Sequence, residues 1–274
     1  VNSTRKITSA MKMVASAKLH KAQAAIESML PYERRLHHIL TDFMSNCTEV
    51  TSPFIVKREV KKVAVVVFAS NTSLCGGFNA NVIRHLVDLL AEYKPLGLEN
   101  ILVFPVGKKV ADAVRKLGFR IEGDFQHMAD KPSYQEAADL AADLMKRFLH
   151  GDVDKVELLY NHFKSTASQI LTRETYLPID LNNEKKEEER TIDYILEPSA
   201  EELMQEMLPK VLRMKMFTVL LDSNAAEHAA RTMAMQIATD NANELLQELT
   251  VMYNKSRQQS ITNELLDIVG GSMA

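Results

Sequence analysis

The sequence has few of the residue patterns that build catalytic or metal sites. Its two cysteines, Cys47 and Cys75, form no metal-binding spacing, and there is no tryptophan. The histidines form no HxxxH or HExxH pair. Two isolated cysteines predict reduced thiols in a cytosol-like compartment, without a disulfide framework or a metal site.

Long apolar runs are also missing. The longest, Val63–Ala69, is far shorter than the roughly 20 residues that a membrane-spanning helix needs. Residues 1–20 have the pattern of an amphipathic helix and not that of a signal peptide. No capping residue precedes this pattern, so we expect the helix to begin before Val1. The net charge of −3 and the apolar content of 46% are typical of a soluble protein.

Proline and glycine are missing from the whole stretch Lys210–Val269. As one helix it would be about 90 Å long, at about 1.5 Å per residue. The average helix of a globular protein has about 11–12 residues, so a compact domain of this size could not bury such a rod. We therefore expect the helix to reach a partner. A capping box at Ser199–Glu202 should open the helical region, and Pro209 should bend it.

Three zones follow one another along this predicted helix. Val211–Leu221 is apolar nearly all round and should be buried on most sides. Residues 222–263 are mainly small and polar, which predicts an exposed shaft. At the tip, apolar residues cover one arc of roughly 160° at about 100° per residue: Ile261, Leu265, Leu266, Ile268 and Val269.

The first 50 residues predict another long helix. Pro31 should kink this helix without necessarily ending it, and Pro53 is the expected end. Apolar and small residues recur at spacings of three and four, the pattern of a coiled-coil seam: Ala15, Leu19, Ala22, Ile26, Met29, Leu36, Leu40 and Phe43.

Acidic residues are missing before Glu27, where basic ones are frequent. Three interpretations stay open: a solvated face, an acidic protein partner, or nucleic acid. No aromatic residue is interleaved, so stacking on nucleic acid is unsupported. The basic residues are Arg5, Lys6, Lys12, Lys18 and Lys21.

Residues 60–197 alternate between strand and helix patterns, which predicts βαβ units and a largely parallel sheet. Strands are predicted at Lys62–Phe68, Ile101–Val106 and Lys155–Phe163. Two more strand-like runs, Gln169–Leu177 and Thr191–Leu196, flank a charged hairpin tip at residues 182–190. Predicted helices contain Val82–Leu90, Lys108–Leu117, which stops at Gly118, and a capping box at Ser133–Glu136 that opens a helix to about Leu149.

No catalytic centre can be identified from these motifs. The loop Ser73–Asn79 follows the first strand, where α/β folds bind phosphates, but it matches neither GxGxxG nor the P-loop pattern. Gly107 lacks the upstream glycine of a P-loop, and there is no GxSxG. We therefore expect the Ser73–Asn79 loop to be a turn that needs positive φ or a close backbone approach.

The predicted fold class is α/β, with a long antiparallel coiled coil of the two terminal helices and an inserted Rossmann-like domain. The predicted divisions are residues 1–52, an N-terminal coiled-coil helix; 60–197, an α/β domain; and 199–274, a C-terminal helix that pairs with residues 1–52. Antiparallel pairing follows if both helices leave the same side of the inserted domain.

Six segments carry a family resemblance. Near the start they are Ile7–Ala15 with Lys18 and Leu19, and in the middle Leu74–Asn79. Near the end they are Ala226–Arg231, Ala238–Ala242, and Tyr253–Gln258 with Ile261–Leu265. Together these segments resemble the signatures of the gamma subunits of F-type ATP synthase. The resemblance covers essentially the whole chain, with a short N-terminal segment of the family expected to be missing.

The resemblance implies the rotor shaft of the central stalk, a non-catalytic subunit without cofactors and present once per complex. In this family the terminal helices enter a hexamer of alpha and beta subunits, and the α/β domain faces the epsilon subunit and the ring of c subunits. Rotation of the ring is transmitted to the catalytic hexamer, and ATPase activity and proton flow are regulated. The implied place is the cytoplasmic face of the bacterial inner membrane, reached only through the complex, with no nucleic acid.

The resemblance also implies contacts with beta subunits. Lys12 is basic where some relatives carry an acid, which questions its particular pairing. Two other functions stay open: a coiled-coil adaptor that dimerises through its rod, and a nucleotide-binding enzyme that uses the Ser73–Asn79 loop. In this family the shaft contacts two parts of the beta subunits, called the levers and the catch. The residues that match these contacts are Met11 and Lys12 for the levers, and Arg257, Gln258, Thr262 and Glu264 for the catch.

Overall fold

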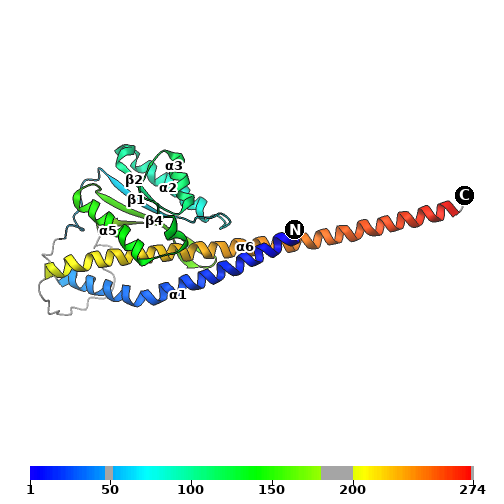
Figure 1. Ribbon diagram of the computed structural model, residues 1–274, viewed down its shortest axis with the longest axis horizontal. Helices are drawn as coiled ribbons and strands as arrows, with labels where there is room; N and C mark the ends of the chain where they lie inside the picture. The colour runs from blue at the N-terminus through cyan, green and yellow to red at the C-terminus, as the bar shows by residue number, and fades with distance from the viewer. Residues whose placement is uncertain (47–51, 180–199, 273–274) are drawn as a thin grey trace.

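The computed structural model describes residues 1–46, 52–179 and 200–272. Two long helices, α1 (Asn2–Asn46) and α6 (Ala200–Ser272), lie side by side and run antiparallel, and an α/β domain packs against them (Figure 1). The predicted fold class, a coiled coil of the terminal helices with an inserted α/β domain, is confirmed.

A five-stranded sheet forms the centre of the α/β domain, in the order β3-β2-β1-β4-β5. The first four strands are parallel, and β5 pairs antiparallel with β4. Every residue of the central strand β1 is buried, as expected of a parallel strand covered on both faces. The strands are β1 (Val63–Phe68), β2 (Ile101–Val106), β3 (Arg120–Ile121), β4 (Lys155–Ser165) and β5 (Ser168–Leu177).

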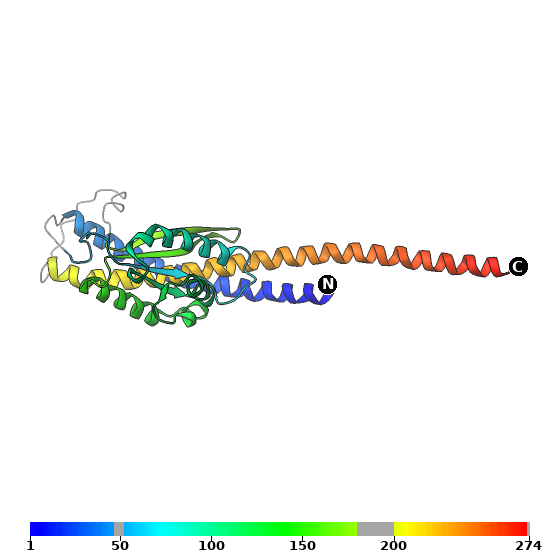
Figure 2. The ribbon, with the colours of Figure 1, turned by 90° about the horizontal axis from the view of Figure 1, so that it is seen from above.

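Helices cover both faces of this sheet (Figure 2). On one face, Val63, Val65 and Val67 of β1 pack with α2 (Phe78–Tyr93) and α3 (Lys108–Leu117). On the other face, β1 packs with α4 (Gln126–Asp130), α5 (Tyr134–His150) and the first part of α6. Two short 3-10 helices, Lys94–Leu96 and Leu98–Asn100, precede β2.

The first part of α6 is a core element of the α/β domain. Leu212, Met216 and Leu220 are buried in the same apolar cluster as Phe68 of β1. The predicted burial of Val211–Leu221 on most sides is thereby confirmed. The prediction that the helix is exposed from residue 222 onward is wrong for its first residues, because Ser223–Ala229 is buried as well. Small side chains there allow α1, β4 and the loop after β1 to approach α6 closely.

The seam between α1 and α6 changes character along its length. In its lower part, beside the α/β domain, Leu19 and Ala22 of α1 pack against Ala225 and Ala229 of α6, as the apolar spacing predicts. Its upper part, toward the C-terminal end of α6, is polar, with three hydrogen bonds between side chains of the two helices. The bonded pairs are Arg5 with Asn243, Thr8 with Thr239, and Lys12 with Gln236.

One predicted helix cap differs from the structure. Pro31 and Pro209 lie inside continuous helices, so neither proline ends its helix. Ser133 precedes α5 as predicted, but its side chain makes no capping hydrogen bond, and Glu136 instead contacts His127 Nδ1 at 3.0 Å. Predictions for Cys47, residues 182–190, Thr191–Leu196 and the Ser199 cap lie outside the described residues.

Candidate functional site

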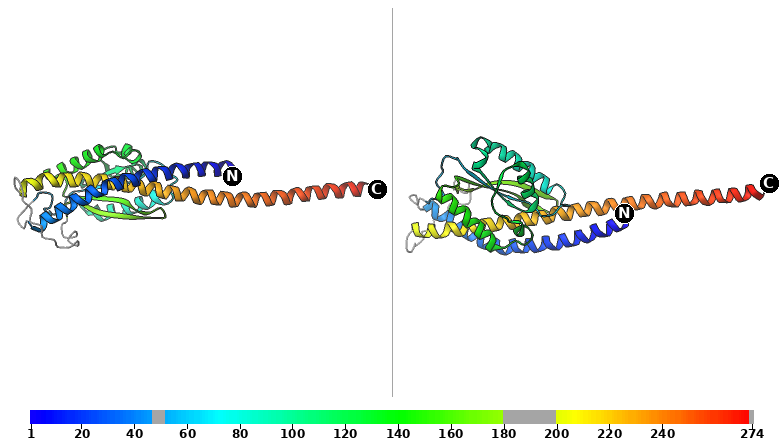
Figure 3. Two further views of the ribbon diagram at one scale, coloured as in Figure 1. Left: turned by 90° about the horizontal axis from the view of Figure 1, so that it is seen from below. Right: turned by 45° about the horizontal axis from the view of Figure 1, so that its top comes forward.

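The upper part of α6 projects beyond the rest of the molecule (Figures 1 and 3). Arg5 Nη1, near the start of α1, donates to Asn243 Oδ1 at 3.2 Å. Every described residue from Gln247 to Val269 is exposed. This length of α6 is therefore available on all sides to a partner.

An apolar arc lies at the tip of this exposed helix, as the sequence predicts. Its side chains, from Ile261 to Val269, are between 48% and 68% exposed. Single exposed apolar side chains are ordinary, but a contiguous group marks an interaction site. Val251, Met252 and Tyr253 form a further group at 60% to 67% exposure, within a stretch that is otherwise mainly polar.

The four predicted catch residues all lie on this exposed part of α6. At about 100° per residue, Gln258 and Thr262 fall within the apolar arc, whereas Arg257 lies about 20° and Glu264 about 40° beyond its edge. Thr262 Oγ1 donates to the Gln258 carbonyl oxygen at 2.9 Å, so this hydroxyl bonds its own helix. The helix thus gathers the four side chains around one side of the tip.

The two predicted lever residues lie on α1 and are only half-exposed. Lys12 Nζ donates to Gln236 Oε1 of α6 at 2.5 Å. Its ammonium group is therefore bonded within the seam. Lys6, Lys18 and Lys21 are exposed and carry most of the accessible positive charge on this half of α1.

The loop after β1 is folded onto α6. Cys75 and Phe78 are buried against Ala226. Gly76 has φ +59°, with Ala234 Cβ 3.8 Å from where its own Cβ would be. The expectation of a turn with positive φ is thus confirmed, and Leu74 also adopts a left-handed conformation at φ 68°.

Arg231 of α6 fixes this loop from the outside. Its Nη1 donates to the Ser73 carbonyl oxygen at 2.5 Å, and its Nη2 donates to Glu227 Oε1 at 2.7 Å. Burial raises the pKa of Glu227 above its ordinary value, although Arg231 opposes that change. No motif in the sequence predicts this role of Arg231. The only local signal is the spacing of four between Glu227 and Arg231, which places an acid and a base on one helix face.

Asn79, in the first turn of α2, bonds back to Ser70 at the other end of this loop. Asn79 Nδ2 donates to Ser70 Oγ at 2.8 Å, and Asn79 Oδ1 accepts from the Ser70 backbone N–H at 3.0 Å. The loop is thus held by its own side chains and by α6.

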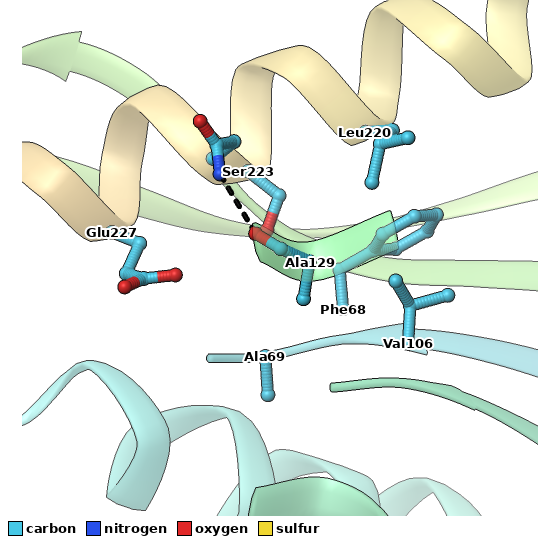
Figure 4. Close-up of a pocket in the computed structure, with 8 residues that line it drawn as sticks. Phe68, Ala69, Val106, Ala129, Leu220, Ser223 and Glu227 are labelled. Atoms are coloured by element: carbon cyan, nitrogen blue, oxygen red, sulfur yellow. Dashed lines mark hydrogen bonds between the residues drawn. The ribbon is translucent and has the colours of Figure 1, made fainter. Parts of the chain in front are cut away.

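A small pocket remains where β1 and β2 end against α6 (Figure 4). Its room suffices for about one water molecule. A nucleotide would not fit, because α6 occupies the crevice in which α/β folds bind one. The pocket is lined by Phe68, Ala69, Val106, Ala129, Leu220, Ser223, Asn224 and Glu227.

The described part of the chain holds neither a metal-binding cluster nor a helix that could cross a membrane. Across residues 1–46, 52–179 and 200–272, no group of three or more His, Cys, Asp or Glu side chains could hold a metal ion. None of the helices described is long and apolar enough to cross a membrane.

Comparison with known proteins identifies the family. A sequence model of the ATP synthase family matches residues 1–274. The chain is 81% identical to the ATP synthase gamma chain of Phocaeicola vulgatus and 64% identical to that of Bacteroides fragilis, in each case over 100% of this chain and 96% of the relative. In the solved structures, a chain of the Tetrahymena thermophila mitochondrial ATP synthase central stalk and c-ring has the same fold, with TM-score 0.60 and 22% identity over 85% of this chain and 99% of that one. The chain therefore belongs to the ATP synthase gamma chain family.

Proposed function

We propose that this chain, a non-catalytic central-stalk subunit of ATP synthase, is the rotor shaft that links a membrane ring to the catalytic hexamer of alpha and beta subunits. The observation that supports this role most directly is the exposed upper half of α6. A single helix that projects into solvent with an apolar arc at its tip requires a partner to cover that arc.

The distribution of side chains on α6 suits a helix that turns inside a sleeve. Between Asn243 and the tip the surface is mixed, with glutamates, glutamines and serines around apolar residues, three of which are consecutive at Val251–Tyr253. Such a surface can pass several equivalent partners without adhering strongly to one of them. The apolar arc then seats the tip at the far end of the hexamer.

We assign the beta-subunit contacts to both helices. Arg257, Gln258, Thr262 and Glu264 hydrogen-bond the catch region, since all four lie exposed on the side of the tip arc or just beyond its edge. Met11 and Lys12 lie near the levers of the beta subunits. The ammonium group of Lys12 is less free to reach a partner than those of exposed Lys6, Lys18 and Lys21, because it bonds Gln236. The attraction between these basic residues and the acidic levers acts over a long range at low salt. At 0.1 M salt it is largely screened beyond about 10 Å.

At the other end, the α/β domain faces the membrane and contacts the epsilon subunit and the ring of c subunits. The chain then lies at the cytoplasmic face of the bacterial inner membrane, which it reaches only through these partners. One copy serves each complex, because one rotation axis holds one shaft. Residues 1–52, 60–197 and 199–274 are the corresponding divisions of the chain: coiled-coil helix, α/β domain and long helix. Through its contacts with the hexamer, the epsilon subunit and the c ring, the chain regulates ATPase activity and proton flow.

Co-expression with the alpha and beta subunits of the same organism tests the proposal. We expect the three chains to co-purify at one shaft per hexamer and to hydrolyse ATP, and the isolated chain to have no ATPase activity. Light scattering on the isolated chain separates the shaft from the adaptor hypothesis. A stable homodimer through α6, or failure to co-purify with the hexamer, would contradict the rotor-shaft function.

A further inference from the structure

Two turns of α6 are enclosed on every side. Every residue from Ser223 to Ala229 is buried. A helix repeats every 3.6 residues, so burial over this length means that neighbours surround the whole circumference. Leu19 and Ala22 of α1 cover one side, and the α/β domain covers the others. We call this enclosed segment, Ser223–Ala229, the collar.

The apolar contacts of the collar are made largely by alanine. Ala225, Ala226 and Ala229 are fully buried. Helices interlock through ridges of side chains, and an alanine face has very shallow ridges. These contacts therefore hold the helix in place but resist its rotation about its own axis only weakly.

Three polar side chains of α6 cross from the collar and its two ends to the α/β domain. Asp222 Oδ1 accepts from the Phe163 backbone N–H of β4 at 2.8 Å. Asn224 Nδ2 donates to the Ala129 carbonyl oxygen of α4 at 2.9 Å (Figure 4). The third, Arg231, donates to the carbonyl oxygen of Ser73 at 2.5 Å. Each bond ends on a backbone atom of the α/β domain, so it ties α6 to a fixed element and not to another side chain.

The bond of Asp222 leaves α6 on the side opposite to the bonds of Asn224 and Arg231. At about 100° per residue, Asn224 and Arg231 point about 160–180° away from Asp222. Bonds on opposite sides of an axis act as a couple, so a turn of α6 relative to the domain strains them together. The side chain of Asp222 is doubly engaged, because its Oδ2 also lies 2.7 Å from His162 Nδ1. This arrangement adds, at the collar, to the resistance to rotation that Leu212 and Met216 supply where the first part of α6 packs into the α/β core.

We propose that Asp222, Asn224 and Arg231 form a torsional joint that locks the α/β domain to α6, so that torque passes between the domain and the shaft. The proposal rests on the rotor-shaft function and names the residues that make that shaft rigid at its root. All three are positioning residues, since none touches a nucleotide or a catalytic site. Two of the three bonds, those of Asp222 and Arg231, are charge-assisted. The loss of one of them should raise about tenfold the fraction of molecules in which α6 is turned relative to the domain.

The test uses the assembled ATP synthase in vesicles. Parent complex, Asp222→Ala, Asn224→Ala, Arg231→Ala and the triple variant are compared for ATP hydrolysis and for ATP-driven proton pumping. Glu206→Ala is the matched control, since Glu206 is an exposed residue of the same helix that pairs only with Lys210 in the contacts described. We expect the triple variant to keep the parent's ATP hydrolysis while its protons pumped per ATP fall severalfold, and Glu206→Ala to match the parent in both.

A second measurement reports the joint directly. With the hexamer fixed to a surface, a bead is attached through a cysteine introduced at exposed Asp88 of α2, and its angular fluctuations are recorded while the motor pauses. The joint variants should widen these fluctuations, and Arg231→Lys should widen them less than Arg231→Ala. A merely structural role would instead lower assembly yield and both activities together, with fluctuations as in the parent.

The outcomes are separable from those of the rotor-shaft proposal. A parent complex that fails to assemble or to pump overturns the shaft function itself. A parent that pumps, with a triple variant that keeps its pumping ratio and its fluctuations, overturns the joint and leaves the shaft intact. If the triple variant does not assemble, the single variants decide by the same two measurements.

Discussion

Thr8 and Thr239, separated by 231 positions in the chain, lie with their hydroxyl oxygens 2.8 Å apart across the α1–α6 seam. Thr8 is 9% exposed and Thr239 is half-buried, so the pair is partly enclosed. Buried polar pairs in a coiled coil fix register at some cost in stability. The pair therefore sets how α1 is aligned along α6 just above the apolar part of the seam.

Replacing one threonine should cost more than replacing both. In Thr8→Val the Thr239 hydroxyl faces a methyl group, and we expect a loss of about 1 kcal/mol. In Thr8→Val with Thr239→Val the two methyl groups pack together, so most of that loss should be recovered. Urea unfolding of the purified chain and its single and double variants completes the cycle. Strictly additive losses would show that the two hydroxyls do not interact.

Acid should weaken the fold through His228. Burial, together with the positive charges of Lys18 and Arg231, lowers the pKa of His228 to about 4. Its Nδ1 has no hydrogen-bond partner among the described residues. An unfolded histidine has a pKa of about 6.5, so between pH 6.5 and 4 the unfolded chain binds the extra proton and stability falls as pH is lowered. Across this pH window the free energy of unfolding should fall by about 3 kcal/mol.

The measurement is urea unfolding at several pH values between 7 and 4. His228→Gln should flatten the acid loss, since glutamine takes up no proton. His85→Gln, on the exposed surface of α2, is the control for the loss of an imidazole elsewhere in the fold. Glu227 acts in the opposite direction, because a carboxyl pKa raised by burial makes the folded state bind the proton first. A His228→Gln profile identical to that of the parent would contradict the prediction.

The strands and long helices follow from the sequence because their patterns are local. Val63–Phe68 is a continuous β-branched run, and the Leu86 and Leu90 positions of α2 repeat at helical spacing. By contrast, β3 and α4 have two and five residues, too few to show any period. The collar could not be predicted, because its small and polar residues resemble those of an exposed shaft. Only distant residues, such as Phe163 and Phe78, bury it.

The candidate site divides in the same way. The apolar tip arc can be read from spacing alone, because all its members share one helix. The Lys12–Gln236 bond and the Arg231–Ser73 contact join residues far apart in the chain, so no local pattern reveals them. The role of Arg231 therefore had to come from the structure.

Two glycines of the α/β domain should respond very differently to alanine. Gly107 has φ +114°, and a Cβ there would lie 2.2 Å from the Ala69 carbonyl oxygen, a backbone atom that cannot turn aside. Gly118 has φ +77° with open space around its Cβ position. Gly118→Ala should therefore cost only its backbone strain, about 1–2 kcal/mol. Gly107→Ala adds a backbone clash and should exceed 3 kcal/mol, roughly the upper range for single substitutions. Equal shifts in the urea midpoint would refute the clash.

The predicted catch contacts can be separated from helix stability. Arg257→Ala with Gln258→Ala changes two exposed side chains, and alanine is the best helix former, so the helicity of the isolated chain should be unchanged. ATP synthesis by the assembled complex should fall, because both side chains face the beta subunits in the proposed function. Circular dichroism and ATP synthesis are measured on the same variant. A parallel loss of helicity and synthesis would make the two residues structural.

A charge placed in the tip arc should act only in the complex. Leu265 is 57% exposed, and surface substitutions usually change stability by less than about 0.5 kcal/mol, so Leu265→Asp should unfold with the parent in the isolated chain. In the hexamer the carboxylate would be buried against an apolar sleeve without a partner, which is costly. Ser260→Asp is the matched control, because at about 100° per residue position 260 lies on the side of α6 opposite the middle of the arc. Assembly yield and ATP synthesis should therefore fall for Leu265→Asp and hold for Ser260→Asp. Equal losses in both variants would mean that the tip senses charge on any face, and that the apolar arc has no special seat in the hexamer.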